Sequence, residues 1–388
     1  MSSFREGNHV QLLRSGAEYF PALEQAIDEA RREIFFETYI FRADRIGERI
    51  ALALMRAARR GVLVHLVMDG FGSRDFPEAL RGRLFDAGVQ VLVFRPEVAR
   101  LRLRRHRLRR LHRKLAVIDG SVAFCGGINI IADDNGIAPD MLPRFDFAVQ
   151  VQGPLVADLL STMRQLWVRL VWTNWRRPWR PSARVEPDRT PRGLHRAALV
   201  IRDNLRHRRD IEQAYLAAMR GARREIIIAN AYFFPGKIFR DVLIEAARRG
   251  VRVVLLLQGR IEHFLLHFAT RALYGHLRAA GIEIYEYRKS FLHAKVAVID
   301  GRWATVGSSN IDPFSLLVAR EANVMVEDET FADTLRVSLH FAMRDAATRV
   351  SDDSWVLLSL PTRMLSWTAY WIARVMAGLS GYARGEFG

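Results

Sequence analysis

The stretch HRKLAVIDG at residues 112–120 returns in the second part of the chain as HAKVAVIDG at residues 293–301. Each copy is an apolar run with β-branched residues that ends in Asp-Gly, a pattern typical of a strand that closes in a turn. In both copies a glycine follows the histidine at +14 and an asparagine follows it at +17. The chain has 11 histidines and only four lysines, so two chance copies of His-x-Lys-x4-Asp are not expected. The chain therefore carries an internal duplication.

Further repeated stretches surround these motifs. ARREI occurs at 30–34 and 222–226, and ARRGV occurs at 58–62 and 247–251. Each copy predicts a helix, a strand, a second helix and a second strand. The predicted elements are helix 19–32, strand 33–41, a helix ending at Gly61 and strand 62–68, and then helix 211–224, strand 225–234, a helix ending at Gly250 and strand 251–257. Alternating strands and helices predict an α/β fold, here in two tandem halves.

The repeat also suggests where the chain divides. We place a first half at 1–190, a second half at 191–350 and an amphipathic tail at 351–388. Between the halves, 167–193 carries four prolines among arginines and tryptophans, which predicts a surface connection. The stretch 167–175 that leads into it predicts a core-packed helix, with interfacial anchoring as the alternative for Trp175 and Trp179. A helix over 364–382 would gather tryptophans on one wide apolar face, typical of a helix lying in the headgroup layer of a membrane. Packing of this helix on its own domain or on a second subunit is the alternative.

The composition limits the classes of function. With 388 residues the chain has material for two or three cores. Its single cysteine, Cys125, cannot form an intrachain disulfide or a cysteine-rich zinc site. A net charge of +17 favours an anionic partner, either nucleic acid or an anionic membrane surface. We expect neither a signal peptide at 1–24 nor a membrane-spanning segment.

The repeated polar residues predict phosphoryl chemistry. Two residues apart on a strand, His112 and Lys114 share one face, as do His293 and Lys295. A neutral imidazole can attack phosphorus while the ammonium neutralises a phosphate oxygen. Two such half-sites face to face would supply one histidine as nucleophile and the other as acid for the leaving oxygen. A solvated polar strand face, retained only because the gene duplicated, is the alternative.

Other residues of the repeat complete the candidate site. Asp119 and Asp300 belong to the catalytic motif, and their place at the turn suggests that they fix the backbone or orient a partner. Neutral donors to the phosphate oxygens are expected from Asn129, Asn310 and Ser308. We expect no metal, since a lysine two residues from each histidine would repel a divalent cation.

These paired motifs resemble the phospholipase D superfamily, and within it the bacterial cardiolipin synthases that lack N-terminal membrane helices. The resemblance covers about 8–345. The stretches that carry it are 69–73, 112–114 with 126–129, 208–212, 230–233 and 322–324. It implies two α/β/α sandwich halves related by a pseudo-twofold axis, with the active site at their junction, and a phosphatidyltransferase without metal or cofactor that forms a phosphatidyl-histidine intermediate.

The resemblance also implies roles for single residues. In the family an acidic residue after each motif orients a histidine, and Asp146 and Glu321 match that place. Gly127 departs from the family, because many relatives have serine there. The first half-site is therefore one hydroxyl short, which argues against equal roles for the two halves.

The distribution of the basic residues bears on whether the partner is a membrane or a nucleic acid. The first copy has about a dozen extra residues before its histidine, rich in arginine. These arginines are Arg100, Arg102, Arg104, Arg105, Arg107, Arg109 and Arg110. They predict a rim that gathers phospholipid headgroups; a solvated loop and a nucleic-acid groove are the alternatives. In the second half 264–268 predicts an acyl-chain entrance or a core helix, and we interpret His263 and His267 as surface histidines.

We therefore predict a cardiolipin synthase that converts two phosphatidylglycerols into cardiolipin and glycerol. His112 is the predicted nucleophile and His293 the predicted acid. A hydrolytic phospholipase D and another phosphatidyltransferase are the alternatives, followed by an endonuclease and by a non-catalytic basic scaffold. The predicted partner is an anionic membrane containing phosphatidylglycerol and cardiolipin, with no nucleic acid. The predicted location is the bacterial cell membrane, peripheral and on its cytoplasmic side. The sequence makes no prediction of oligomeric state.

Overall fold

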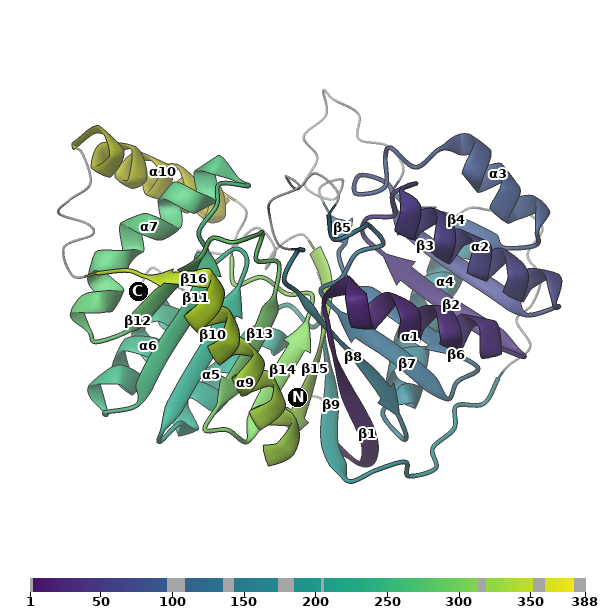
Figure 1. Ribbon diagram of the computed structural model, residues 1–388, viewed down its shortest axis with the longest axis horizontal. Coiled ribbons are helices and arrows are strands. Elements are labelled where there is room, and N and C mark those ends of the chain that lie inside the picture. Colours follow the sequence, from purple (N-terminus) through teal and green to yellow (C-terminus); the bar gives the residue numbers. More distant parts are fainter. Residues whose placement is uncertain are drawn as a thin grey trace.

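The computed structural model describes residues 3–95, 109–134, 143–173, 185–203, 206–312, 319–351 and 360–379. Two α/β halves lie side by side and meet along a central group of strands (Figure 1). The predicted α/β architecture in two tandem halves is therefore confirmed.

The first half begins with a strand that precedes the repeated pattern. Its elements are β1 (Arg5–Arg14), α1 (Ser15–Glu29), β2 (Glu33–Thr38), α2 (Arg45–Arg59), β3 (Leu63–Asp69), α3 (Glu78–Asp86), β4 (Gln90–Phe94), β5 (Arg110–Leu111), β6 (Lys114–Ile118), β7 (Val122–Gly126), β8 (Phe147–Gln152) and α4 (Val156–Thr173).

The second half repeats this order and adds a strand and a helix at its end. Its elements are β9 (His195–Arg202), α5 (Asp210–Gly221), β10 (Glu225–Asn230), α6 (Lys237–Arg248), β11 (Arg252–Gln258), α7 (Phe264–Ala279), β12 (Glu283–Tyr287), β13 (Lys295–Ile299), β14 (Trp303–Gly307), β15 (Ala319–Glu327), α9 (Glu329–Ala346), β16 (Ala347–Arg349) and α10 (Leu360–Leu379).

The strands of both halves belong to one sheet. In the first half their order is β4-β3-β2-β6-β7-β8-β1, and in the second it is β12-β11-β10-β13-β14-β15-β9, with β16 beside β12. Each strand thus has a counterpart at the same place in the other half. β1 joins the halves, because it pairs antiparallel with β8 of its own half and with β9 of the other. The matching orders give the molecule a pseudo-twofold axis near the β1–β9 pair.

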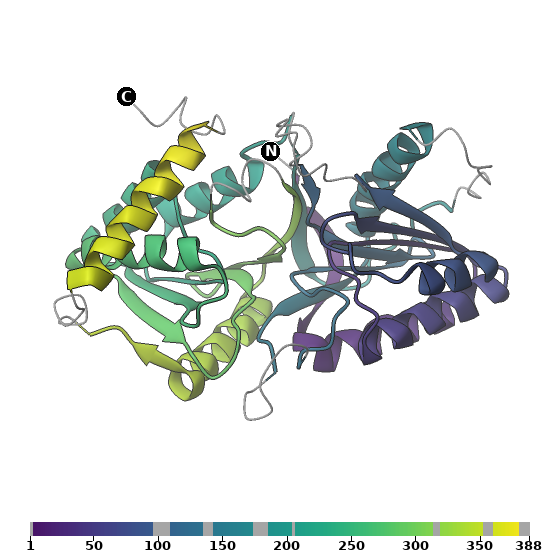
Figure 2. The ribbon, with the colours of Figure 1, turned by 90° about the horizontal axis from the view of Figure 1, so that it is seen from above.

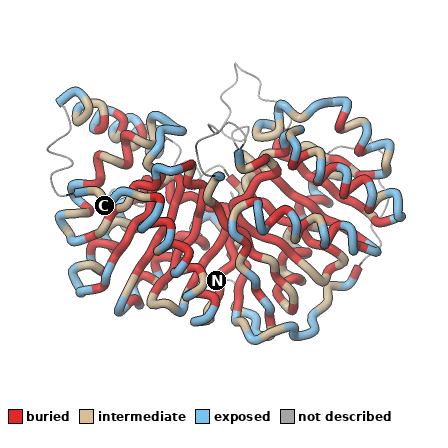
Figure 3. Tube along the Cα trace, viewed as in Figure 1, coloured by how far each residue is buried: buried red, intermediate tan, exposed pale blue. Residues whose placement is uncertain are grey.

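Helices cover both faces of each half. Figure 2 shows the strands between helices on two sides. In the first half α1, α2 and α3 share a core with one face of the sheet, and α4 packs on the other face. In the second half α5, α6 and α7 cover one face, and α9 covers the other. Strands covered on both faces are mostly apolar, and β2 and β13 are buried at every residue (Figure 3). The buried glutamates of β2 are paired, Glu33 with Arg164 and Glu37 with Arg113.

Local sequence signals set the ends of the repeated helices. Asp44 precedes α2, and its side chain accepts hydrogen bonds from the backbone N–H groups of Ile46 and Gly47, which satisfies donors that the first turn leaves open. Gly61 and Gly250 follow the ends of α2 and α6 with φ of +90° and +87°. This left-handed conformation suits glycine, so the two predicted helix ends are confirmed.

The predicted core packing of the helix before the connection is confirmed for 167–173. These residues belong to α4, and Trp167 is buried against Phe35 and His65, so the connection between the halves begins after α4. The helical pattern continues here because α4 needs this apolar face to cover its sheet. Trp175 and Trp179 fall outside the described residues.

The tail helix packs on its own domain, one of the alternatives that the sequence left open. α10 packs along α7 (Figure 1), with Ser366, Ala369 and Ala373 buried. Its large side chains lie on the exposed side, among them Trp371 and Val375. No helix among the described residues has both the length and the apolar character that crossing a bilayer requires.

Candidate active site

His112 and His293 are brought together by pairing between the halves. β5, directly before His112, runs parallel to the start of β15 in the other half. The His112 backbone N–H donates to the Arg320 carbonyl at 3.0 Å, and the His293 N–H donates to the Phe145 carbonyl at 2.8 Å. His112 is thereby fixed beside Arg320, which precedes Glu321. His293 is fixed beside Phe145, which precedes Asp146.

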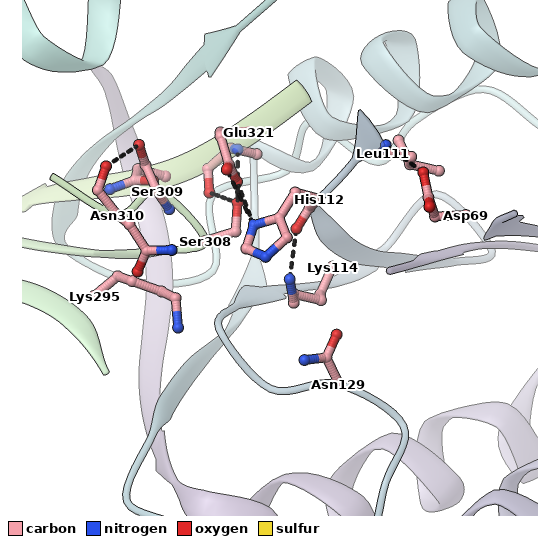
Figure 4. Close-up of polar contacts among 12 residues, drawn as sticks. Asp69, Leu111, His112, Lys114, Asn129, Lys295, Ser308, Ser309, Asn310 and Glu321 are labelled. Atoms are coloured by element: carbon pink, nitrogen blue, oxygen red, sulfur yellow. Dashed lines mark hydrogen bonds and ion pairs between the residues drawn. The ribbon is translucent and has the colours of Figure 1, made fainter. Parts of the chain in front are cut away.

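Each imidazole is hydrogen-bonded by the carboxylate of the other half. The distance from His112 Nδ1 to the Glu321 carboxylate is 3.0 Å (Figure 4), and that from His293 Nδ1 to Asp146 Oδ2 is 2.6 Å. Both carboxylates are buried. A carboxylate that accepts from Nδ1–H leaves the lone pair on Nε2, the nitrogen that can attack or take a proton. The two predicted orienting residues thus lie in the predicted cluster, but in a crossed arrangement.

Two buried lysines lie beside the histidines. Lys114 Nζ donates to the His112 carbonyl at 2.6 Å, and Lys295 Nζ donates to the His293 carbonyl. Burial lowers the pKa of Lys114 to about 7 and that of Lys295 to about 8, although nearby carboxylates oppose the shift. The like charge of Lys295 also lowers the pKa of Lys114. An anion bound between the two would relieve both penalties.

Both histidines favour their neutral form. Burial lowers the pKa of His112, and Glu321 only partly opposes this. Burial together with the charges of Lys295 and Arg144 holds the pKa of His293 well below its ordinary value. An unprotonated imidazole is the form that can act as a nucleophile, so either ring has the protonation state that attack on an electrophile requires.

The glycine at position 127 makes the two half-sites unequal. In the second half Ser308 Oγ donates to Glu321 at 2.5 Å. In the first half a Cβ on Gly127 would lie 2.3 Å from Asp146 Oδ1, so the shorter Asp146 carboxyl occupies the space that a serine would need. The consequence is electrostatic. Burial raises the pKa of Asp146 to about 6, whereas His112, Lys114 and Ser308 outweigh burial and hold the pKa of Glu321 below its ordinary value.

Two asparagines complete the cluster. Asn129 and Asn310 are buried, and Figure 4 shows their side chains turned towards the space that Lys114, Lys295 and the His112 ring also face. The Asn129 Oδ1 accepts from the Ile40 N–H at 3.2 Å, which leaves its amide N–H groups as donors. Amide and ammonium donors around one space form a site for the oxygens of a phosphate group.

Asp119 and Asp300 do not belong to this cluster, which corrects their place among the catalytic residues. Asp119 accepts hydrogen bonds from the backbone N–H groups of 31–33, and Asp300 accepts from those of 223–225. Both follow the far end of a five-residue strand from the catalytic lysine, about 16 Å away for an extended chain. They anchor β2 and β10, in agreement with the backbone role that their turn position suggested.

Several residues around His112 were not predicted from the sequence as part of the site. The Tyr39 ring centroid lies 4.8 Å from that of His112, and Lys114 Nζ lies 5.3 Å from the Tyr39 centroid. Asp69, in the stretch 69–73 that carries the family resemblance, is buried and accepts from the Leu111 N–H at 2.8 Å. It thereby fixes the chain just before His112. The position of Asp69 at the end of a buried strand was the available signal.

Arginine side chains gather near His112 on the first half. The exposed Phe71 ring lies between two guanidinium groups, with Arg74 Cζ 5.3 Å and Arg110 Cζ 5.1 Å from its centroid. Burial lowers the pKa of Arg95, and the like charges of Arg109 and Arg110 lower it further. Of the predicted arginine rim only Arg109 and Arg110 lie within the described residues.

Comparisons with known proteins agree with this geometry. A family model described as "Cardiolipin synthase, PLD-like domain" matches residues 23–165 and 215–341. Cardiolipin synthase B of Escherichia coli (strain K12) is 43% identical over 340 residues, which cover 87% of this chain and 81% of that protein. Cardiolipin synthase A of Pseudomonas syringae pv. syringae is 30% identical over 332 residues, covering 86% and 68%.

Solved structures show the same fold at low identity. Phosphatidylserine synthase of Haemophilus influenzae superposes with a TM-score of 0.74 at 12% identity, covering 100% of this chain and 97% of that one. Polyphosphate kinase of Porphyromonas gingivalis gives 0.59 at 14% identity, covering 96% and 53%.

Proposed function

This chain belongs to the phospholipase D-like cardiolipin synthase family, and on that premise we propose that it transfers a phosphatidyl group from one phosphatidylglycerol to another, forming cardiolipin and glycerol. One observation carries the proposal: the crossed pairs His112–Glu321 and His293–Asp146 enclose two lysines at the junction of the halves. Two imidazoles, two ammonium groups and neutral amides are the set that a two-step phosphodiester exchange needs.

In the first step His112 Nε2 attacks the phosphorus of the donor lipid. The N–P bond forms, the bond from phosphorus to the glycerol oxygen breaks, and His293 gives its proton to that oxygen. The bound phosphate anion raises the pKa of His293 and supplies the reason for its protonation. We assign the attack to His112 because Glu321, held ionised by Ser308 and Lys114, best stabilises the positive charge that develops on its ring.

In the second step the direction of proton transfer reverses. A hydroxyl of the second phosphatidylglycerol gives its proton to His293 as its oxygen forms a bond to phosphorus. The N–P bond breaks and His112 is released. Lys114, Lys295, Asn129, Asn310 and Ser308 are the proposed phosphate-binding and orienting group.

We propose that the reaction takes place on an anionic membrane surface, peripherally and on the cytoplasmic side. The net charge of +17 and the arginines near His112 favour an anionic surface. The exposed apolar side chains of α10 favour a lipid surface over a nucleic acid.

The test uses purified protein and phosphatidylglycerol vesicles, with the lipid products separated and glycerol measured. Cardiolipin and glycerol in equal amounts support the proposal. Phosphatidic acid as the main product would establish a hydrolase, and inert lipid beside cleaved DNA would establish a nuclease. Alanine at His112 or at His293 should abolish cardiolipin formation in folded protein.

A further inference from the structure

A small pocket with both polar and apolar lining residues lies in the second half, near the segment that leads into His293. It lies between the end of β11 and the start of α7, with a volume of about 20 Å³, enough for one water molecule or one hydroxyl group. Gln258, Tyr232, Glu262 and His267 contribute polar groups to its lining. His267, interpreted from the sequence as a surface histidine, is half-buried here.

The polar groups of the pocket suit an uncharged hydroxyl. Tyr232 Oη donates to Glu262 Oε2 at 2.6 Å, so the carboxylate retains further lone pairs for a second donor. Burial raises the pKa of Glu262, but His293, Tyr232 and Arg144 outweigh it and lower the pKa below its ordinary value. Burial also raises the pKa of Tyr232 well above its ordinary value. An ionised carboxylate beside a protonated phenol can accept a hydrogen bond from a hydroxyl group.

The pocket is coupled to His293 by contact and by charge. Gln258 Oε1 accepts from the Leu292 N–H at 3.3 Å, one residue before His293. Glu262 raises the pKa of His293 and that of Lys295, so its carboxylate acts on the same space. A hydroxyl in the pocket would therefore belong to the molecule that exchanges a proton with His293.

The corresponding positions of the first half carry different side chains. Phe41 and Phe233 form matching bridges in the two halves, so Ile40, which precedes Phe41, corresponds to Tyr232. β3 ends at Asp69 and β11 ends at Gln258, so Ser73, four residues after β3, corresponds to Glu262. The Ser73 hydroxyl is used by the backbone, donating to the Tyr39 carbonyl and accepting from the Phe41 N–H. The hydroxyl of Ser73 is therefore occupied by backbone groups, whereas Glu262 at the matching position of the second half is bonded by the Tyr232 side chain.

We propose that the pocket of Tyr232, Glu262 and Gln258 binds the middle hydroxyl of a glycerol group while a terminal oxygen of that group lies at His293. The inference rests on the proposed function. The same group enters from two sources, as free glycerol and as the headgroup of the acceptor lipid. By holding its middle hydroxyl, Glu262 and Tyr232 act as positioning residues that select a polyol over water.

The test compares glycerol with 1,3-propanediol, which lacks only the middle hydroxyl. Detergent-dispersed phosphatidylglycerol serves as donor, deuterated glycerol and the diol compete as soluble acceptors, and the phosphatidyl products are quantified by mass. We expect the wild type to prefer glycerol by about tenfold or more. Tyr232→Phe and Glu262→Gln should each bring the preference close to one. A second arm compares phosphatidylglycerol with phosphatidyl-1,3-propanediol as lipid acceptor, and we expect the same loss there.

The ratio of products from one enzyme does not depend on how much of a variant is folded. Tyr285→Phe is the matched control, since Tyr285 makes a similar bond to Glu283 on the outer strand β12 at 3.2 Å, and it should keep the wild-type ratio. A wild type without preference, or variants that retain it in both arms, would overturn the inference. If the variants lose the preference in only one arm, the pocket binds the glycerol group from that source alone, either free glycerol or the lipid headgroup. A wild type that transfers to no alcohol would instead refute the proposed function.

Discussion

At the scale of single residues, each histidine depends on a carboxylate that the sequence places far away. His112 is 209 positions from Glu321, and His293 is 147 positions from Asp146. Because the pairs are crossed, a substitution in either half changes the chemistry of the other half's imidazole. Glu321 accepts a hydrogen bond from Ser308, whereas Gly127 offers no hydroxyl to Asp146. We therefore expect different catalytic roles for His112 and His293.

The assignment of the nucleophile can be tested with a p-nitrophenyl phosphodiester lipid, whose leaving group departs without a proton. His293→Ala should still release one equivalent of nitrophenolate per enzyme in a burst, because only the acid is missing. His112→Ala should give no burst. Rapid-mixing absorbance measures both, and the opposite pattern would assign the attack to His293.

A second prediction concerns Gly127. Gly127→Ser places a Cβ within 2.3 Å of Asp146 Oδ1, so it should displace the carboxyl from His293 and lower kcat by about tenfold or more. The double variant Gly127→Ser with Asp146→Glu copies the Ser308–Glu321 arrangement and should recover part of that loss. Steady-state rates and thermal unfolding are measured on both. A single variant with normal kcat would contradict the steric explanation.

The two lysines predict a fall in activity at alkaline pH. A lysine with a lowered pKa is charged below that pKa and loses its charge as the pH rises through it. Since the pKa values are about 7 for Lys114 and about 8 for Lys295, kcat/KM for phosphatidylglycerol should begin to decline near pH 7 and fall more steeply above about pH 8. Profiles of kcat/KM between pH 6 and pH 9.5 test this, with circular dichroism to verify folding. A flat profile would show that the ammonium charges are not needed.

At the scale of elements, α10 has one side packed on α7 and one exposed apolar side. Small residues such as Ala369 and Ala373 let it approach α7, while Met364, Trp371 and Val375 remain exposed. A row of large apolar side chains on one helix is unusual on a soluble surface and typical of a contact with lipid.

The double variant Trp371→Ser with Val375→Ser should therefore weaken binding to anionic vesicles by about tenfold. Activity on detergent-dispersed substrate should change little, because neither side chain is buried. Sedimentation with vesicles measures binding, and Phe341→Ser, an exposed position on α9, is the matched control. Equal loss in the vesicle and detergent assays would contradict an interfacial role for α10.

At the scale of the whole molecule, the halves share a sheet and a core. β1 pairs with strands of both halves, and a single buried cluster includes Val149 of the first half and Val324 of the second. Neither half can therefore open without exposing apolar surface of the other.

We expect one cooperative unfolding transition in place of two. Differential scanning calorimetry should give a calorimetric enthalpy close to the van't Hoff enthalpy. The substitution Asp300→Ala, which removes a backbone anchor in the second half, should shift the whole transition. Two separate transitions, of which only one responds to the substitution, would show independent halves.

The sequence by itself determined the duplication, the α/β layers and the histidines and lysines of the site, because these follow from local spacing and from strand and helix periodicity. It also suggested the backbone role of Asp119 and Asp300, which sit in a turn. Only the tertiary structure decided that Glu321 reaches His112 and Asp146 reaches His293, that Gly127 leaves room for Asp146, and that Tyr232 and Glu262 line a pocket near the segment that leads into His293. These contacts join residues far apart in the chain, and which of them meet depends on how the sheets pair across the junction.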